Sequence, residues 1–384
     1  MTRPLTRQGR APRAALGAPQ VLRTLDELET IAPEWDELAL LARSPFLTVE
    51  WLTSWWSVLG TAEPLVLVQR DEAGRLAGAA FCRRTPQRLE AAANLWSGNW
   101  DVLARDEAAR RELWHALAQH APGRLRLVGL IEEAPETQVA RESLRAAGYS
   151  LSRRGGVGCP FLVLPDGWET LIGGVSRNLR SQVARRGRAL ERLGTVRFRT
   201  VTGGDELPSA LGHVLRLEGS GWKAREGTAI LSDPALEALY RSFAARAAER
   251  GWLRLHLLEL DDEPIAADFG IAFGSTGFLM KTGFDERYGE LSPGLVLRAR
   301  ALRASIEEGL RAYDFLGRAE PYKLRWGAHP RPRFVLLAYR GAATLPERVF
   351  ERAVRPAAKR VALATVLRNR ARRGASPPSA SSEP

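Results

Sequence analysis

Cysteine, histidine and long apolar runs are scarce in this chain of 384 residues. The two cysteines, Cys82 and Cys159, have no metal-ligand spacing, and neither do the five histidines, so no metal is expected. No apolar run reaches the roughly 18 residues that a membrane span needs, and the arginine-rich start lacks the apolar core of a signal peptide. No serine-hydrolase elbow and no P-loop is present. These absences predict a cytoplasmic protein, since the low cysteine content suits a reducing compartment.

Lysine is scarce as well. Of the 56 basic residues only four are lysines, and three of them, Lys223, Lys281 and Lys323, lie in short motifs within about 100 residues. An ammonium group is compact and can lose its proton, whereas a guanidinium group is planar and permanently charged. We therefore predict a site that involves these three lysines. A compositional bias toward arginine with chance clustering is the alternative.

The chain is rich in positive charge and in apolar residues. Its formal net charge is +12 and its pI is near 10.5, which favours polyanionic partners such as nucleic acids, anionic lipid surfaces and phosphate-bearing cofactors. Hydrophobic residues make up 45% of the chain and include eleven tryptophans, enough for sizeable cores. The length predicts two domains with tails.

The order of predicted elements suggests two copies of one plan. In the first half we expect helices near 28–41 and 51–59, a hairpin (64–68 and 76–82), helices 106–120 and 135–147, and strands 125–130 and 161–164. In the second half we expect helices 166–174, 176–193, 205–218, 233–250 and 293–308, with strands 195–201, 252–260, 265–273, 277–283, 312–316 and 333–340. The predicted units are a flexible basic arm (1–19), two α/β domains (20–163 and 164–342), a basic helical tail (343–373) kinked at Pro356, and a disordered end (374–384).

A helix start follows the strand 277–283. Ser292 suits an N-cap, Pro293 suits the first helical position, and Gly294 lets a ligand approach the backbone closely. The free amides of a helix N-terminus bind anions, so a pyrophosphate is expected on Ser292, Gly294 and Leu295, with charge added by Arg287 or Arg298. An ordinary capped helix is the alternative.

Three strands, a loop, a helix and another strand in this order resemble the core of the GNAT acyltransferase superfamily. In that fold two strands splay apart, here 277–283 and 312–316, and the pantetheine of acyl-CoA pairs in the gap. Leu-Ser-Pro-Gly replaces the familiar pyrophosphate loop of the family. Most of the chain, from about 20 to 340, is similar to the tandem-GNAT branch labelled CelD-like (cellulose-biosynthesis acetyltransferase) and, distantly, to Fem-type aminoacyl transferases. The resemblance rests on PFLTVEW (45–51), SRNLR (176–180), EGSGWKAREGTA (218–229), KTGFD (281–285), SPG (292–294) and YKLRW (322–326).

The resemblance implies a fold of two tandem GNAT-like α/β domains, each with a mixed, mainly antiparallel sheet flanked by helices. It also implies acyl transfer from acyl-CoA, such as acetyl-CoA, to an amine or hydroxyl of a small molecule or glycan precursor. Such a reaction needs a base, an oxyanion stabiliser and an acid for the leaving thiolate. The residues expected in these roles are Glu218 or Asp268, Lys281 or Lys223, and Tyr313 or Tyr322, respectively. For Asp268 a structural ion pair with Lys281 is the alternative.

Substrate-binding residues are expected around the same segments. The segment 222–228 has the composition of an acceptor-binding loop, although a packed surface loop is the alternative. Asp314 ends the second splayed strand, where a turn residue is also common. Lys323 is flanked by two aromatic residues. The predicted set is Trp222, Lys223, Arg225, Asp285, Asp314, Lys323 and Trp326.

Two arginine-rich helices leave other functions open. The helix 176–192 suits tRNA phosphates if the donor is aminoacyl-tRNA, as in Fem-like enzymes, and nucleic acid is not expected otherwise. The segment 345–373 suits an anionic membrane surface, which would place the protein at the inner membrane face. The alternatives to an acyl-CoA enzyme are therefore a tRNA-dependent aminoacyl transferase and a non-catalytic binding protein of an exopolysaccharide complex.

Overall fold

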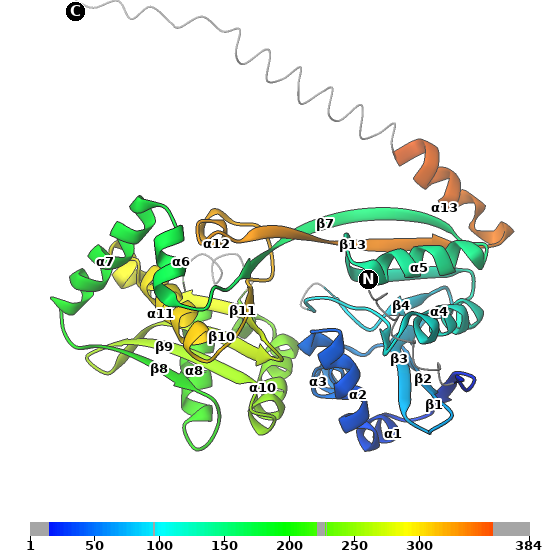
Figure 1. The fold of residues 1–384 in the computed structure, drawn as a ribbon, viewed down its shortest axis with the longest axis horizontal. Helices are drawn as coiled ribbons and strands as arrows, with labels where there is room; N and C mark the ends of the chain where they lie inside the picture. The colour runs from blue at the N-terminus through cyan, green and yellow to red at the C-terminus, as the bar shows by residue number, and fades with distance from the viewer. Residues whose placement is uncertain (1–14, 95–96, 221–226, 228, 356–384) are drawn as a thin grey trace, which may run out of the picture.

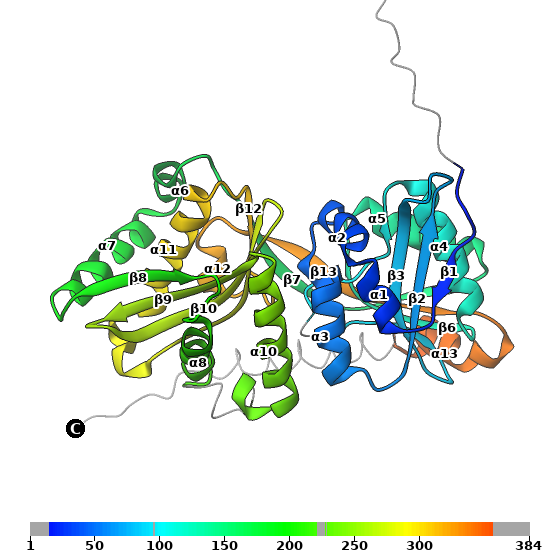
Figure 2. The same cartoon turned by 90° about the horizontal axis from the view of Figure 1, so that it is seen from below.

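The molecule consists of two lobes that lie side by side and are bridged by two long strands, β7 and β13 (Figures 1 and 2). The computed structural model describes residues 15–94, 97–220, 227 and 229–355. The rest of the predicted basic arm, the tail beyond residue 355 with its kink at Pro356, and the end 374–384 lie outside the described residues.

The first lobe follows the predicted order. Its elements are β1 (Gln20–Leu22), α1 (Leu25–Thr30), α2 (Ala32–Leu41), η1 (Pro45–Leu47), α3 (Val49–Leu59), β2 (Glu63–Arg70), β3 (Leu76–Arg84), β4 (Leu89–Ala91), β5 (Leu103–Ala104), α4 (Glu107–His120), β6 (Arg124–Ile131), α5 (Pro135–Ala146) and β7 (Ser150–Val163). The helix expected over 28–41 is two helices. Pro33 stands in the first turn of the second one, where its missing N–H breaks the hydrogen-bond ladder of a continuous helix.

The second lobe also matches the predicted elements closely. They are α6 (Trp168–Gly174), α7 (Arg177–Glu191), β8 (Val196–Val201), α8 (Leu207–Glu218), η2 (Ile230–Ser232), α10 (Pro234–Glu249), β9 (Leu253–Leu260), β10 (Glu263–Phe273), β11 (Thr276–Phe284), η3 (Glu286–Leu291), α11 (Pro293–Glu307), β12 (Ala312–Asp314), α12 (Pro321–Leu324), β13 (His329–Tyr339), η4 (Ala342–Thr344), α13 (Leu345–Val349) and a π-helical turn, η5 (Phe350–Val354). None of the helices among the described residues is both long and apolar enough to span a bilayer.

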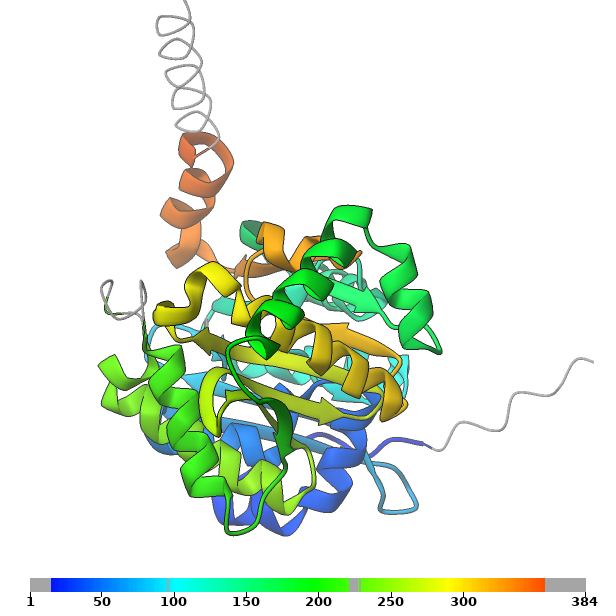
Figure 3. The same cartoon turned by 90° about the vertical axis from the view of Figure 1, so that its left-hand side faces the viewer.

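One sheet of thirteen strands runs through both lobes. Twelve strands follow the order β1-β2-β3-β4-β6-β13-β7-β12-β11-β10-β9-β8, and β5 pairs with β3 off this path. The pairs β4–β6 and β11–β12 are parallel and the others are antiparallel. Helices α8 and α10 cover one face of the second lobe, while α7 and α11 cover the other (Figure 3). This mixed, mainly antiparallel sheet flanked by helices is the predicted fold class.

Strand β13 was expected in the second half, but it lies between β6 and β7. It pairs with β7 from His329↔Phe161 to Tyr339↔Ser150, and β12 continues the sheet on the far end of β7 through Ala312↔Val163. Strand β7 therefore belongs to the sheet of both lobes. The domain division at residues 163 and 164 stays a prediction.

The lobes also meet where α3 packs on α10. Trp51 contacts Phe243 edge to face, with ring centroids 4.9 Å apart. Beside them Arg250 of the second lobe bonds two buried carboxylates of the first, Asp36 at 2.7 Å and Glu50 at 3.1 Å. Burial, and then the charge of Glu50, raise the pKa of Asp36 to about 7. Two carboxylates thus share one arginine at the junction.

Candidate active site

Strands β11 and β12 separate after a short parallel contact. They pair only at Thr276↔Ala312, Gly277↔Tyr313 and Phe278↔Asp314, whereas β11 continues along β10 to Phe284. After β12 the chain turns away through Leu316 and Gly317, which have left-handed φ angles of 50° and 58°. The result is the pair of splayed strands that the resemblance implied, with one edge of β11 uncovered by β12 beyond Phe278.

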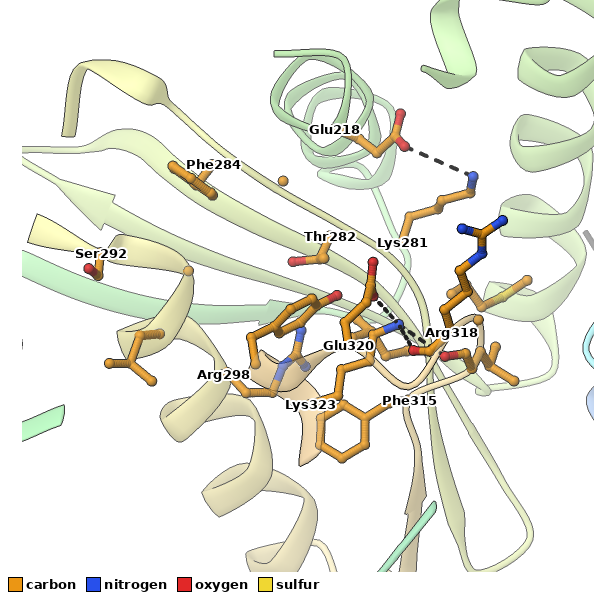
Figure 4. A pocket seen from close by; sticks show the side chains of 18 of the residues that line it. Glu218, Lys281, Thr282, Phe284, Ser292, Arg298, Phe315, Arg318, Glu320 and Lys323 are labelled. Atoms are coloured by element: carbon orange, nitrogen blue, oxygen red, sulfur yellow. Dashed lines mark hydrogen bonds and ion pairs between the residues drawn. The ribbon is translucent and has the colours of Figure 1, made fainter. Parts of the chain in front are cut away.

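A cavity of about 780 Å³ lies against this uncovered edge (Figure 4). Its wall combines β11 beyond Phe278, the start of α11, the loop after β12, α12, and the end of α8. The predicted site residues in the wall are Glu218, Lys281, Ser292, Gly294, Leu295, Arg298, Tyr322, Lys323 and Trp326. Nine residues predicted from separate motifs therefore line one cavity.

Glu218 and Lys281 point toward one another at one end of the cavity (Figure 4). The Lys281 Nζ lies 3.9 Å from Glu218 Oε1 and 5.4 Å from the centre of the Tyr240 ring. The Ile230 N–H donates to Glu218 Oε2 at 2.9 Å. Gly283 permits this approach, because a Cβ there would lie 2.2 Å from the Leu217 carbonyl oxygen. The absence of a side chain lets β11 pack tightly on the end of α8.

The start of α11 forms another part of the wall. Ser292 occupies the N-cap position and Pro293 the first turn, as predicted, but Ser292 has a left-handed φ of 52° and its side chain makes no cap hydrogen bond. Its carbonyl instead accepts from the Leu295 N–H at 2.9 Å. A Cβ at Gly294 would meet only the Phe284 ring, at 3.4 Å. The positive end of this 15-residue helix dipole therefore faces the cavity.

Arg298 lies one turn further along α11 and also lines the cavity. It donates to Asp268 at 2.8 Å and to the Tyr313 hydroxyl at 2.7 Å. Burial raises the pKa of Tyr313 to about 12. The pairing of Asp268 with Lys281 that we considered is replaced by this contact, and in the described part of the chain neither Asp268 nor Tyr313 reaches the cavity wall.

Lys323 is buried and holds the loop after β12. Its Nζ donates to the carbonyls of Leu316 at 3.0 Å and Arg318 at 3.3 Å, and pairs with Glu320 at 2.9 Å. Burial lowers the pKa of Lys323. Tyr322 is 41% exposed; partial desolvation of its hydroxyl and then the Glu320 carboxylate raise the pKa of Tyr322 above its ordinary value. A compact ammonium group suits the Lys323 position, because two carbonyl oxygens and one carboxylate surround a single point.

The remaining predicted residues lie elsewhere. Arg287 bonds Asp285 at 2.6 Å and Glu263 at 2.7 Å on the surface, and Asp314 is buried between arginines. Within the described residues none of these three predicted residues, Asp285, Arg287 and Asp314, lines the large cavity. Trp222, Lys223 and Arg225 lie outside the described residues.

The prediction missed several wall residues, among them Phe284, Arg318, Glu320 and Arg325. Arg298, predicted as an alternative to Arg287, does line the cavity; it stands four residues after Gly294 and therefore on the same helix face. Over the ranges that the structure describes, no group of three histidine, cysteine or acidic residues is placed to hold a metal ion.

Residues 177–324 match the family model described as an acetyltransferase (GNAT) domain. The chain contains a GNAT-type acetyltransferase domain. This domain supplies most of the cavity wall, including Glu218, Lys281 and Gly294. The predicted CelD-like branch stays a prediction.

Solved structures show the same fold across both lobes. FemX is similar with a TM-score of 0.56 and 12% identity, over 83% of this chain and 98% of that chain. The C-terminal domain of a putative lysylphosphatidylglycerol synthetase from Agrobacterium fabrum is similar with a TM-score of 0.52 and 10% identity, over 86% and 97%. No curated protein matches the chain. The GNAT-type domain is thus one lobe of a larger two-lobed fold.

Proposed function

We propose that the protein is an acyltransferase that moves an acyl group from acyl-CoA, such as acetyl-CoA, to an amine or hydroxyl of a small molecule or glycan precursor. The observation that carries this proposal is the 780 Å³ cavity, which has the start of α11, the open edge of β11 and the Glu218–Lys281 pair in one wall.

The wall suits the parts of acyl-CoA. The edge of β11 beyond Phe278, along which β12 no longer pairs, suits the two amides of pantetheine, which would pair there as an added strand does. The Gly294 N–H at the start of α11, beside Ser292, suits the pyrophosphate, whereas the Leu295 N–H already donates to the Ser292 carbonyl. Arg298, Arg318 and Arg325 add positive charge to the wall, which favours a polyanionic donor.

The proposed chemistry assigns three roles. Glu218 takes a proton from the acceptor amine or hydroxyl as its nitrogen or oxygen attacks the thioester carbonyl carbon. Lys281 stabilises the oxyanion that forms. Collapse of the intermediate breaks the carbon–sulfur bond, and Tyr322, which a raised pKa keeps protonated at neutral pH, donates a proton to the leaving thiolate. Tyr322 suits this role better than Tyr313, because Tyr322 lines the cavity.

Thiol release from acetyl-CoA in the presence of candidate acceptors tests this assignment. We expect Glu218→Gln to lower kcat by about 10² to 10⁴ while the Kd for acetyl-CoA stays within twofold. The matched control is Glu249→Gln, an exposed glutamate at the end of α10, which should leave both values unchanged. Full activity in Glu218→Gln would remove Glu218 from the mechanism.

A tRNA-dependent aminoacyl transfer is the second candidate, and α7 favours it. Arg177, Arg180, Arg185, Arg188 and Arg192 are exposed along this helix and its end, a row of charge that suits phosphates. Activity with acetyl-CoA that survives saturating RNase treatment would contradict this candidate. Loss of activity after RNase would support it.

The biological setting stays a proposal too. A role in polysaccharide or envelope synthesis, a cytoplasmic site at the inner membrane face and contact of 345–373 with anionic lipid are compatible with this enzyme. A non-catalytic binding role predicts that Lys281→Ala and Glu218→Gln proteins still restore function in a deletion strain. Loss of function in both folded variants would support catalysis.

A further inference from the structure

A second cavity, of about 360 Å³, lies at the junction of the two lobes. Its wall takes segments of β6, β7 and β13 together with Asn94, Ser97 and Gly98, and it reaches β11. Four residues, Met280, Lys281, Leu316 and Gly317, line both this cavity and the large one. The two cavities therefore meet beside the side chain that we assign to the oxyanion.

The shared wall is held in a fixed conformation. Leu316 has a left-handed φ of 50°, which costs a residue with a side chain about 1 to 3 kcal/mol. Its N–H donates to Asp314 Oδ1 at 2.9 Å, and its carbonyl accepts from Lys323 at 3.0 Å. These bonds keep the Leu316 and Gly317 backbone between the two cavities.

Arg333 gives the second cavity its chemical character. This buried side chain donates to Asp314 Oδ2 at 2.5 Å and to the Gly98 carbonyl at 2.7 Å. Its buried Nε–H finds no acceptor among the residues that the structure describes. Asp314 also bonds Arg331 at 3.2 Å, so one carboxylate balances two guanidinium groups.

The wall itself adds no negative charge. Within the described residues no aspartate or glutamate lines this cavity, and the charged wall residues are Lys281 and Arg333. Lys281 is paired with Glu218, so the excess positive charge is that of Arg331 and Arg333 over Asp314. This excess together with the spare Nε–H donor favours an anionic oxygen, because a charge-assisted bond satisfies both. A cationic polyamine would meet repulsion there.

We propose that the second cavity binds the acceptor, and that the acceptor carries a carboxylate or phosphate group held by Arg333. This inference rests on the proposed acyltransferase function. The acceptor's amine or hydroxyl lies at the shared wall beside Lys281, where the acyl carbon arrives from the large cavity. A volume of 360 Å³ is at the lower end of small-ligand pockets, about 300 to 1,000 Å³. The acceptor group that enters is therefore of amino-acid or monosaccharide-phosphate size.

Matched pairs of acceptors, one member with an anionic group and one without, test whether the acceptor carries a carboxylate or a phosphate. L-phenylalanine is compared with 2-phenylethylamine, and glucosamine 6-phosphate with glucosamine, by thiol release from acetyl-CoA. We expect the anionic member of at least one pair to have a kcat/KM at least tenfold higher, and the pair that shows it distinguishes a carboxylate from a phosphate. Equal or better use of the members that lack the anion would overturn the proposal. So would no turnover of either anionic member by protein that binds acetyl-CoA.

Two variants test whether the acceptor binds in the second cavity. Val157 of β7 lines the second cavity, so Val157→Trp should raise the acceptor KM at least tenfold without changing the Kd for acetyl-CoA. Val163→Trp, at an exposed position of the same strand, is the control. Arg333→Lys keeps the charge but removes Nε, and should abolish the preference within a pair. An unchanged KM in Val157→Trp or an unchanged preference in Arg333→Lys would refute the second cavity alone. Failure of the wild-type protein to bind acetyl-CoA would refute the proposed function instead.

Discussion

Replacement of Glu50 by glutamine should make the protein more stable at pH 8 and flatten its pH dependence. In the folded protein Asp36 is buried beside Glu50, and both share Arg250. The folded pKa of Asp36 is raised from its ordinary 3.8 to about 7. The folded state therefore holds a proton that the unfolded chain has lost between about pH 4 and pH 7, and stability falls as pH rises through that window.

The size of the expected stability change follows from the pKa shift of Asp36. At about 1.4 kcal/mol per pKa unit, the shift of Asp36 corresponds to at most about 4 kcal/mol lost by pH 8. Burial is its largest cause and Glu50 the second. Two like charges a few ångströms apart repel by roughly 4 kcal/mol at an effective dielectric constant near 20, and the shared Arg250 offsets part of this repulsion. We expect Glu50→Gln to recover about 1 to 3 kcal/mol at pH 8 and little at pH 5.

Urea unfolding of both proteins at pH 5, 6, 7 and 8 measures this effect. Glu29→Gln is the control, because Glu29 pairs with Arg246 across the same junction at 3.0 Å, but on the surface. It should change stability by less than about 1 kcal/mol at every pH. Wild-type stability that is flat from pH 5 to 8, or an equal loss in Glu50→Gln at both ends, would refute the reasoning.

Three further changes probe the walls of the large cavity. Arg298→Met leaves the buried Asp268 without its guanidinium partner and should lower the free energy of unfolding in urea by about 3 to 5 kcal/mol. The surface control Arg303→Met should lower it by less than about 0.5 kcal/mol. Equal losses in the two variants would contradict a stabilising buried pair. Lys323→Arg places a larger group at a site only 6% exposed and should lower the unfolding free energy by about 1 to 3 kcal/mol; no loss would show that arginine serves there equally well. Tyr322→Phe should lower kcat at least tenfold with the Kd for acetyl-CoA unchanged, and unaltered thiol release would exclude Tyr322 as the acid.

Local patterns predicted most of the fold because most elements carry their own periodicity. The tryptophans of α3, the hairpin β2–β3 and the order β11–α11–β12 all have short-range signals. Strands β4 and β5 are too short to have one. The place of β13 between β6 and β7 depends on pairing across about 200 residues, which no local pattern encodes.

The candidate site was predictable as a group of segments but not as a set of contacts. Strand register decides which side chains meet: Asp268 lies opposite Thr282, and Lys281 lies opposite Phe269. Asp268 and Lys281 therefore point to opposite faces of the sheet, since neighbouring residues of a strand alternate. The scarcity of lysine was a better guide to the candidate site than the predicted side-chain contacts, because Lys281 and Lys323 line one cavity.

In the proposed function, acyl-CoA binds with its pyrophosphate at the start of α11. Isothermal titration of acetyl-CoA into the wild-type protein and into Gly294→Asp measures this contact. The Gly294 position has room for a side chain, so the new carboxylate repels the pyrophosphate without disturbing the fold. Gly187→Asp on α7, with nothing within 4 Å of the added Cβ, matches the charge change. We expect micromolar binding to the wild-type and Gly187→Asp proteins and none to Gly294→Asp. Equal binding to all three, or no binding to the wild type, would contradict this placement of the pyrophosphate.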